Sequence, residues 1–267
     1  MLPYILTDNS LTIVVDGKAL TMESSNPSFN EATKLLTEER FDELPDLFDV
    51  PKAVEKFAEG NISVSDGEVR YKDEVIHNHV VGRVLDFMRK GLPYKPLVRF
   101  LDKLMENPSR RATNELYAFL EHKAMPLTPD GNFLAYKGVR DDYTDWHSGK
   151  FRNQVGDVQE MTRNNVCDDA NVGCSDGFHA GSYEYAKGYA SSGGNLMIVE
   201  IDPSDVVSVP HDCDCQKLRT ASYKVVGHME SIDAPPLDDG INYDYYSDEE
   251  NEAYAEGYEQ AKKDLGY

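Results

Sequence analysis

The 267-residue sequence has few cysteines, few basic residues and no long apolar run. Four cysteines are too sparse for a disulfide framework in a chain of this length, which excludes a small disulfide-knotted protein. No run approaches the roughly 20 apolar residues that a membrane-spanning helix needs, so no transmembrane segment is expected. The length allows one large domain or two small ones with a sizeable core.

Basic residues are scarce relative to acidic ones. The chain holds 27 lysines and arginines against 48 aspartates and glutamates, a formal net charge of −21. A field of this sign repels phosphate backbones, so we expect no nucleic-acid partner. The first residues contain no basic segment of the kind that opens a secretory signal, so we expect an intracellular protein whose cysteines stay reduced.

Two hairpins are predicted in the N-terminal part of the chain. β-Branched residues flank Asp16-Gly17, and apolar residues alternate with polar ones on both sides of Asp66-Gly67. Aspartate followed by glycine tolerates the two positive φ angles that a two-residue type I′ turn requires. The sequence therefore predicts one hairpin within residues 11–22 and a second within residues 62–71.

Apolar residues recur at helical spacing between and after the hairpins. Residues 28–59 are predicted to form two short acidic helices, with Pro45 and Pro51 breaking the run. Residues 78–120 are predicted to form a cluster of three helices. The hairpins and the helical cluster together are assigned to a first domain, residues 1–124.

Helical periodicity disappears beyond the turn-rich segment that ends at Gly131. Short apolar runs predict a mixed or antiparallel sheet domain with short helices over residues 125–230, so the chain as a whole is predicted to be α+β. Residues 231–267 hold 11 acidic and 2 basic residues, and we expect an acidic tail, disordered to about residue 247 and marginally helical after it, that adds little to the core. The expected strands are residues 133–139, 195–201, 206–209 and 221–227, with a short helix at 184–190.

Several blocks of residues, taken in order, resemble one known family. They include LTPDGNFLAYKGVR at 127–140, DYTDWHSGKF at 142–151, CSDGFHAGS at 174–182 and DPSDVVSVP at 202–210. In this order they resemble the RIIB-type lysis-inhibitor proteins of tailed phages, and residues 84–120 match the same family.

This resemblance implies a phage accessory protein that counters host exclusion in the host cell cytoplasm. It implies a protein partner, either a larger RIIA-type phage protein or a host factor, and peripheral membrane association only through such a partner. It implies no settled chemistry, so the first hypothesis is a non-enzymatic protein that works by binding a protein or a small ligand. The oligomeric state stays open.

A second resemblance links residues 133–201 to the ADP-ribosyltransferase folds, in which a strand bearing an arginine or a histidine grips the nicotinamide cofactor. Tyr136-Lys137-Gly138 occupies the place of that strand motif, with lysine in place of arginine or histidine. A glycine-aromatic segment at 177–182 and a strand at 196–201 follow in the same order, and Glu200 is a lone candidate for the catalytic carboxylate. The resemblance implies an alternative function, an NAD-dependent ADP-ribosyltransferase or a nucleotide-binding relative without turnover.

The candidate site consists of polar residues in loops and at strand ends of the second domain, where functional residues tend to lie. Lys137 and Arg163 would supply charge-assisted hydrogen bonds to an anionic or nucleotide-like ligand. The alternative is a structural polar network that joins the loops to the sheet. No catalytic residue and no cofactor are assigned, although NAD or a nucleotide would suit the alternative function. The candidate ligand-binding residues are Tyr136, Lys137, His147, Arg163, Ser175, His179 and Glu200.

Soft metal ligands are present but poorly spaced. Four cysteines and two histidines could supply a tetrahedral zinc site, yet they lack paired cysteine knuckles, so no metal site is predicted and buried thiols are favoured. A Cys174–His179 nucleophile pair is a further alternative. In the competing interpretation both lie in a turn, where Cys174 packs and His179 hydrogen-bonds the strand at 133–139. The metal-ligand candidates are Cys167, Cys174, Cys213, Cys215, His179 and His211.

Overall fold

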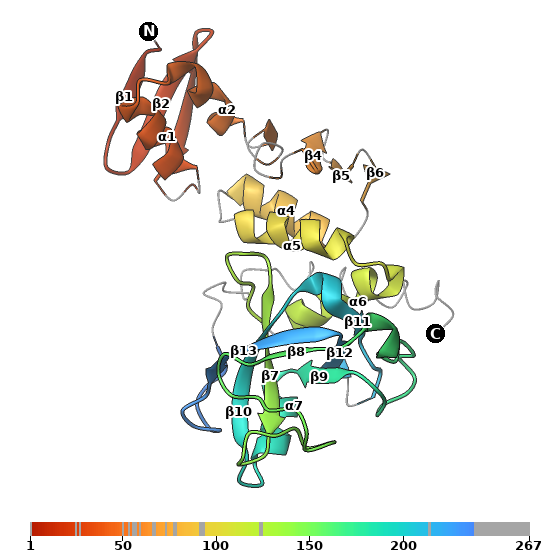
Figure 1. Cartoon of the computed structure of the whole chain (residues 1–267). Coiled ribbons are helices and arrows are strands. Elements are labelled where there is room, and N and C mark those ends of the chain that lie inside the picture. The colour runs from red at the N-terminus through yellow and green to blue at the C-terminus, as the bar shows by residue number, and fades with distance from the viewer. Residues whose placement is uncertain are drawn as a thin grey trace. The chain divides into compact units, whose positions relative to one another are not determined.

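The computed structural model describes most of residues 2–237. Outside the description lie residues 1, 25, 27, 50, 53, 55–57, 59, 66–67, 73, 77–78, 91–93, 123–124, 213–214 and 238–267. Within the described residues, helices accompany three antiparallel sheets, which confirms the predicted α+β class (Figure 1). None of the described helices combines the length and the apolar character that crossing a membrane requires.

The first sheet contains the predicted N-terminal hairpin and one additional strand. Asp16 and Gly17 connect the two strands of the hairpin with φ angles of 49° and 78°, as a type I′ turn requires. The hairpin is therefore confirmed together with its turn. The strands are β1 (Tyr4–Leu6), β2 (Ser10–Val15) and β3 (Lys18–Glu23), in that order across the sheet.

Two helices pack against this sheet, with leucines of both in one cluster with Leu11 and Ile13 of β2. Pro45 lies in the first turn of the second helix, which begins where the sequence pattern predicts a break in the helical run. Proline is tolerated there because the first N–H groups of a helix have no intrahelical acceptor. The second predicted helix, around residues 54–58, lies partly outside the described residues. The two helices are α1 (Phe29–Thr37) and α2 (Leu44–Phe48).

The second hairpin and the three helices after it are confirmed. The turn of this hairpin, Asp66-Gly67, lies outside the described residues. A two-residue strand, β6, extends the hairpin into a small sheet and was too short for sequence periodicity to predict. The elements are β4 (Ile62–Ser65), β5 (Glu68–Tyr71), β6 (Glu74–Val75), α4 (His79–Lys90), α5 (Lys95–Met105) and α6 (Arg110–His122).

A seven-stranded antiparallel sheet follows, in the order β11-β12-β9-β7-β10-β13-β8. The predicted strands at 133–139 and 195–201 are confirmed residue for residue. The strand predicted at 206–209 ends one residue earlier, and the strand predicted at 221–227 is shifted by one residue to 222–228. Three further strands were not predicted. The bounds are β7 (Phe133–Val139), β8 (Val158–Glu160), β9 (Phe178–Gly181), β10 (Asn195–Ile201), β11 (Val206–Ser208), β12 (Lys217–Thr220) and β13 (Ser222–His228).

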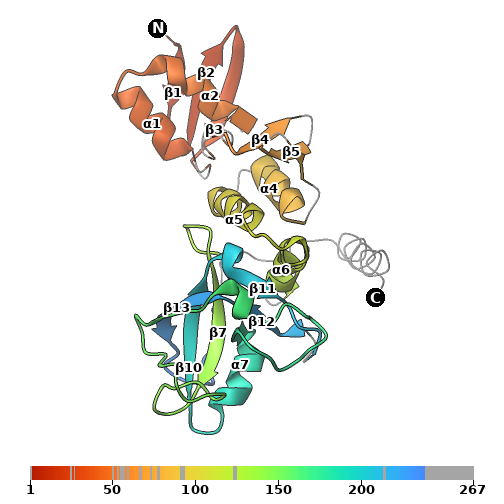
Figure 2. The ribbon, with the colours of Figure 1, turned by 45° about the vertical axis from the view of Figure 1, so that its right-hand side comes forward.

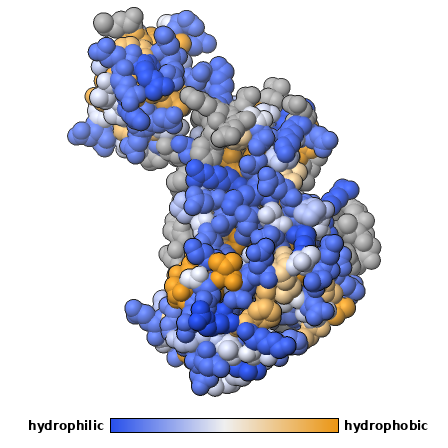
Figure 3. All heavy atoms as spheres, in the orientation of Figure 1, coloured by the Kyte–Doolittle hydropathy of each residue, from blue (hydrophilic) through white to orange (hydrophobic). Residues whose placement is uncertain are grey.

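The predicted short helix is confirmed as α7 (Tyr183–Ala190), which packs against β7 (Figure 2). Ser182 caps it by accepting a hydrogen bond from the Tyr185 N–H at 3.2 Å. Gly138 permits the close approach, because a Cβ there would lie 2.3 Å from the Ala186 carbonyl oxygen. Most of the surface visible in Figure 3 is hydrophilic, and hydrophobic residues gather in a few patches, some of them over this sheet.

Residues 231–237 are packed, which corrects the prediction that the acidic tail begins at residue 231. The Tyr183 hydroxyl shares its one hydrogen between the carbonyl oxygens of Ile232 and Ala234, at 2.6 and 2.8 Å. The Leu237 N–H donates to the Tyr136 hydroxyl at 2.6 Å. A few aliphatic side chains suffice to anchor this segment in a cluster with α7. For residues 238–267, outside the description, the tail stays a prediction.

The α5–α6 connection contacts the edge of the seven-stranded sheet. The Asn107 side-chain amide donates to the carbonyl oxygens of Pro203 and Val206, each at 2.8 Å. Lys103 forms an ion pair with Asp202 at 2.9 Å. The predicted domain boundary between residues 124 and 125 stays a prediction, and these polar contacts cross it.

Glu115 is a half-buried acid where α6 packs on β11. Burial raises the pKa of Glu115 to about 7, against the lowering effects of Arg111, 3.8 Å away, and of the Val209 N–H. Between pH 4.5 and 7 the folded chain binds this proton more tightly than the unfolded chain does. The free energy of unfolding therefore falls as the pH rises through that window.

Glu115→Gln is expected to remove the loss of unfolding free energy that the wild type shows as the pH rises from 4.5 to 7. At pH 8 the variant gains about 1–3 kcal/mol of unfolding free energy over the wild type, whereas at pH 4.5 the two are nearly equal. Urea unfolding at both pH values measures the difference. Glu184→Gln, on an exposed side chain of α7, is the matched control and is expected to show no such pH-dependent gain. A Glu115→Gln effect of the same size at both pH values would contradict the prediction.

Candidate functional site

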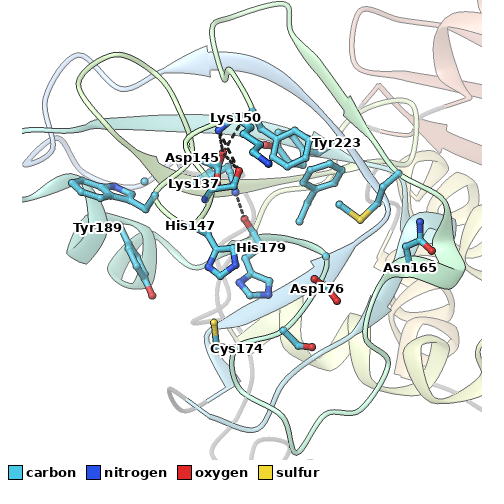
Figure 4. A pocket seen from close by; sticks show the side chains of 18 of the residues that line it. Lys137, Asp145, His147, Lys150, Asn165, Cys174, Asp176, His179, Tyr189 and Tyr223 are labelled. Carbon is cyan, nitrogen blue, oxygen red and sulfur yellow. Dashed lines mark hydrogen bonds between the residues drawn. The ribbon is translucent and has the colours of Figure 1, made fainter.

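A cavity of about 1070 Å³ opens on the seven-stranded sheet (Figure 4). Its lining comes from β7, β9, β13 and α7 and from the two long loops that follow β7 and β8. Those loops, residues 140–157 and 161–177, contain no strand. Several of their polar residues line the cavity. Such a concave surface bounded by loops is the usual setting of a ligand site.

Lys137 supplies a positive charge to this cavity. It lies on β7, where neighbouring residues face opposite sides of the sheet, so Tyr136 points instead toward the α7 cluster. Its ammonium donates one of three hydrogens to the His179 carbonyl oxygen at 2.7 Å and lies 5.3 Å from the Tyr223 ring centroid. Burial lowers the pKa of Lys137 to about 8, with Asp145 opposing the shift, so the ammonium is mostly protonated at pH 7.

His179 is a neutral imidazole beside cationic groups. Burial, together with the charges of Lys137, Lys217 and Arg219, lowers the pKa of His179 to about 3. The Arg219 Nε–H donates to His179 Nε2 at 3.3 Å, which leaves the ring proton on Nδ1. His179 therefore adds a neutral hydrogen-bond donor to the cavity. Its place in strand β9 corrects the prediction that it lies in a turn.

Arg219 organises the loop that forms one wall, and sequence reasoning missed it. Its side chain is fully buried on β12, across from His179 in the neighbouring strand. The guanidinium donates to carbonyl oxygens of residues 167, 169, 172 and 173 and to the Ser208 hydroxyl. A single arginine in a four-residue strand gave no periodic signal that could have identified it.

Asp145 organises the opposite loop. Its carboxylate accepts hydrogen bonds from the N–H groups of Ser148, Lys150 and Phe151, at 2.5, 3.0 and 2.9 Å, and from the Ser148 hydroxyl at 2.8 Å. Burial raises the pKa of Asp145, but these hydrogen bonds outweigh it and hold the pKa at about 2. The loop residues Trp146 and His147 are thereby fixed at the cavity.

Aromatic rings form the inner surface. Phe178 meets Phe151 and Tyr223 edge to face, with centroid distances of 5.0 and 5.4 Å. The Tyr223 hydroxyl donates to the Asn153 side-chain oxygen, and burial raises its pKa. Because the hydroxyl is already paired within the protein, Tyr223 contributes an apolar surface rather than a reactive group.

The structure brings four of the seven predicted site residues together and separates the other three. Lys137, His147, Ser175 and His179 line the cavity. Arg163 instead donates to the Asn107 side chain at 2.9 Å and to the carbonyl oxygens of residues 204 and 206, each at 2.8 Å. Burial lowers the pKa of Arg163, and its charge is used to join the α5–α6 connection to the sheet.

Tyr136 and Glu200 are likewise placed away from the cavity. The Tyr136 hydroxyl accepts from Leu237, as described above, and its ring meets the Tyr183 ring at 5.5 Å. Glu200 accepts a hydrogen bond from the Asn132 side-chain amide at 2.8 Å. Neither residue lines the cavity, so the lone carboxylate that the second resemblance required does not meet Lys137 there.

The described part of the chain contains neither a set of side chains arranged to bind zinc nor a cysteine–histidine pair arranged as a nucleophile and its base. Cys213 lies outside the description, and elsewhere no three histidine, cysteine, aspartate or glutamate side chains converge as a metal ion requires. Cys174 and His179 both line the cavity. However, Nε2 of His179 accepts from Arg219 and Nδ1 carries the proton, so this imidazole is poorly suited to deprotonate a thiol.

These features define an α+β protein with an aromatic-lined cavity that contains a buried lysine, on an antiparallel sheet. The family model described as "Bacteriophage T4 protein rIIB" matches residues 3–238. The chain is also 36% identical over 217 residues to Protein rIIB of Enterobacteria phage T4, covering 81% of this chain and 70% of that protein. The chain therefore belongs to the rIIB family, which confirms the first resemblance. No solved structure matches, and the likeness to ADP-ribosyltransferases stays a prediction.

Proposed function

We propose that this rIIB-family chain counters host exclusion of the phage by binding, and that the cavity at Lys137 holds a small anionic ligand in that role. The observation that carries the proposal is the Lys137 ammonium, which lies in a cavity and, among the residues that the structure describes, has a single hydrogen-bond acceptor, the His179 carbonyl oxygen. An anion would accept its remaining hydrogens and compensate a charge that the site otherwise disfavours.

Binding is favoured over turnover because the groups at the cavity are occupied in holding it together. Asp145 is saturated by its own loop, and His179 is fixed by Arg219. The alternative function, an NAD-dependent ADP-ribosyltransferase, would need a carboxylate at the ligand. Of the lining residues only Asp176 is left for that role, since Glu200 lies elsewhere.

The wider setting of the proposal follows from family membership and charge. An RIIA-type phage protein or a host factor is the proposed partner, in the cytoplasm of the infected cell, with any membrane contact made through that partner. The net charge of −21 supports a protein partner over a nucleic acid.

Lys137→Met is expected to abolish stabilisation by anions while leaving the unliganded protein nearly as stable. The change removes the charge but keeps an unbranched stem, and the lost hydrogen bond is offset by relief of a buried ammonium. Thermal melts with inorganic pyrophosphate, NAD and cyclic AMP measure this. A ligand at one hundred times its dissociation constant adds about 2.7 kcal/mol of stability to a protein that binds it.

The matched control is Lys224→Met, on an exposed lysine of β13, which is expected to keep the full ligand shift. Affinity of the wild type is expected to decline as the pH rises through about 8, where Lys137 loses its proton. Equal ligand shifts in wild type and Lys137→Met, or no shift of the wild type with any of these anions, would reject the proposal.

A further inference from the structure

Aromatic side chains are concentrated, and exposed, at the cavity. Trp146, Phe151 and Tyr189 are 38%, 37% and 46% exposed, and all three line it. Among the described residues, Tyr4 is the only other aromatic side chain that is comparably exposed. Exposed aromatic surface that converges on one concavity indicates a ligand with an apolar, flat part.

Two of these rings are held in place by neighbouring side chains. The Arg140 guanidinium donates to the Trp146 carbonyl oxygen at 2.9 Å, and its carbon lies 5.7 Å from the Trp146 ring centroid. The Tyr189 ring meets the Tyr185 ring at 5.2 Å with an interplanar angle of 62°. Rings that are ordered before binding lose little conformational entropy when a ligand stacks on them.

The ligand must also pair with the positive charge of the Lys137 ammonium in the same cavity. Lys137 offers charge-assisted hydrogen bonds to an anionic group, and no carboxylate is paired with it at ion-pair distance within the described residues. His147, Ser175 and Asn165 line the same cavity and offer further polar groups. One molecule that is flat and aromatic at one end, hydroxylated in the middle and anionic at the other would match all three parts.

We propose that the cavity binds a purine nucleoside monophosphate, with the phosphate on Lys137 and the base on Trp146 and Tyr189. This inference rests on the proposed function, because it names the ligand class of the same anion site. A purine offers the larger stacking face, and stacking reads the face of a base rather than its edges, so AMP and GMP are expected to bind alike.

Trp146 is the single tryptophan of the chain, so its emission reports directly on the cavity. Titration of the full chain with AMP or GMP is expected to change that emission saturably. Ribose 5-phosphate lacks the base and is expected to raise the melting temperature through Lys137 while leaving the emission nearly unchanged. Adenosine, which lacks the phosphate, is expected to bind at least tenfold more weakly than AMP.

Tyr189→Leu is expected to weaken AMP binding about tenfold and to leave ribose 5-phosphate binding unchanged. Tyr4→Leu is the matched control, because Tyr4 is 47% exposed and does not line the cavity. It is expected to bind both probes as the wild type does.

The outcomes separate this inference from the proposed function. If AMP and ribose 5-phosphate bind with equal affinity, and Tyr189→Leu changes neither, base recognition is rejected while the anion site stands. If neither probe binds the wild type, and pyrophosphate does not bind either, the anion site and the inference fall together. Saturable Trp146 quenching by AMP that Tyr189→Leu weakens and Tyr4→Leu does not would support the inference.

Discussion

Arg219→Met is expected to lower the free energy of unfolding by at least about 3 kcal/mol. The arginine side chain is fully buried, and its guanidinium is the donor to four carbonyl oxygens in residues 167–173. Methionine fills similar space but donates nothing, so those acceptors lose their partners, and each unsatisfied buried polar group costs about 1–3 kcal/mol. Urea unfolding of the two proteins measures the loss.

A local readout distinguishes loss of loop anchoring from a general weakening of the core. Amide hydrogen exchange of residues 167–176 is expected to accelerate well below the melting temperature, because that loop depends on Arg219 for its backbone partners. Arg152→Met is the matched control: this side chain is 64% exposed, pairs with Asp157 at 2.8 Å, and is expected to change stability far less than Arg219→Met does. Two variants of equal stability would show that the buried hydrogen bonds contribute nothing net.

Arg219 also illustrates what periodicity does not reveal. Strands β7 and β10 were predictable because each is a continuous run in which apolar residues dominate, and both are largely buried. Strand β12 is Lys-Leu-Arg-Thr, four residues that are all buried. The guanidinium of its Arg219 finds its carbonyl partners on a loop 46 to 52 residues away in sequence, so no local pattern marks this segment as a strand.

The candidate site was partly predictable for a related reason. A lysine inside an apolar strand is an anomaly that sequence shows, and Lys137 does line the cavity. The same strand shows why Tyr136 does not, since alternate residues of a strand face opposite sides, and this rule was available from sequence alone. Arg163 could not be assigned from sequence, because its partners depend on how the α5–α6 connection meets the sheet.

Deleting residues 231–267 is expected to lower the free energy of unfolding by about 2–4 kcal/mol. The deletion removes the hydrogen bond that the Tyr183 hydroxyl shares between two carbonyl oxygens, the hydrogen bond to the Tyr136 hydroxyl, and the packing of Ile232, Ala234 and Leu237 beside α7. For a chain of this size that loss corresponds to a fall in melting temperature of roughly 5–15 °C. Calorimetry of the full chain and of the chain that ends at Glu230 measures it.

A second truncation, after Leu237, isolates the packed segment from the charged one. Residues 238–267 contain 10 acidic and 2 basic residues with only two aliphatic side chains larger than alanine, so their removal deletes mainly mutual repulsion. The chain that ends at Leu237 is therefore expected to melt within a few degrees of the full chain. Melting of both truncations together, well below the full chain, would place the stabilising contacts beyond Leu237. Melting of both with the full chain would instead show that the contacts of residues 231–237 with Tyr136 and Tyr183 add little to stability.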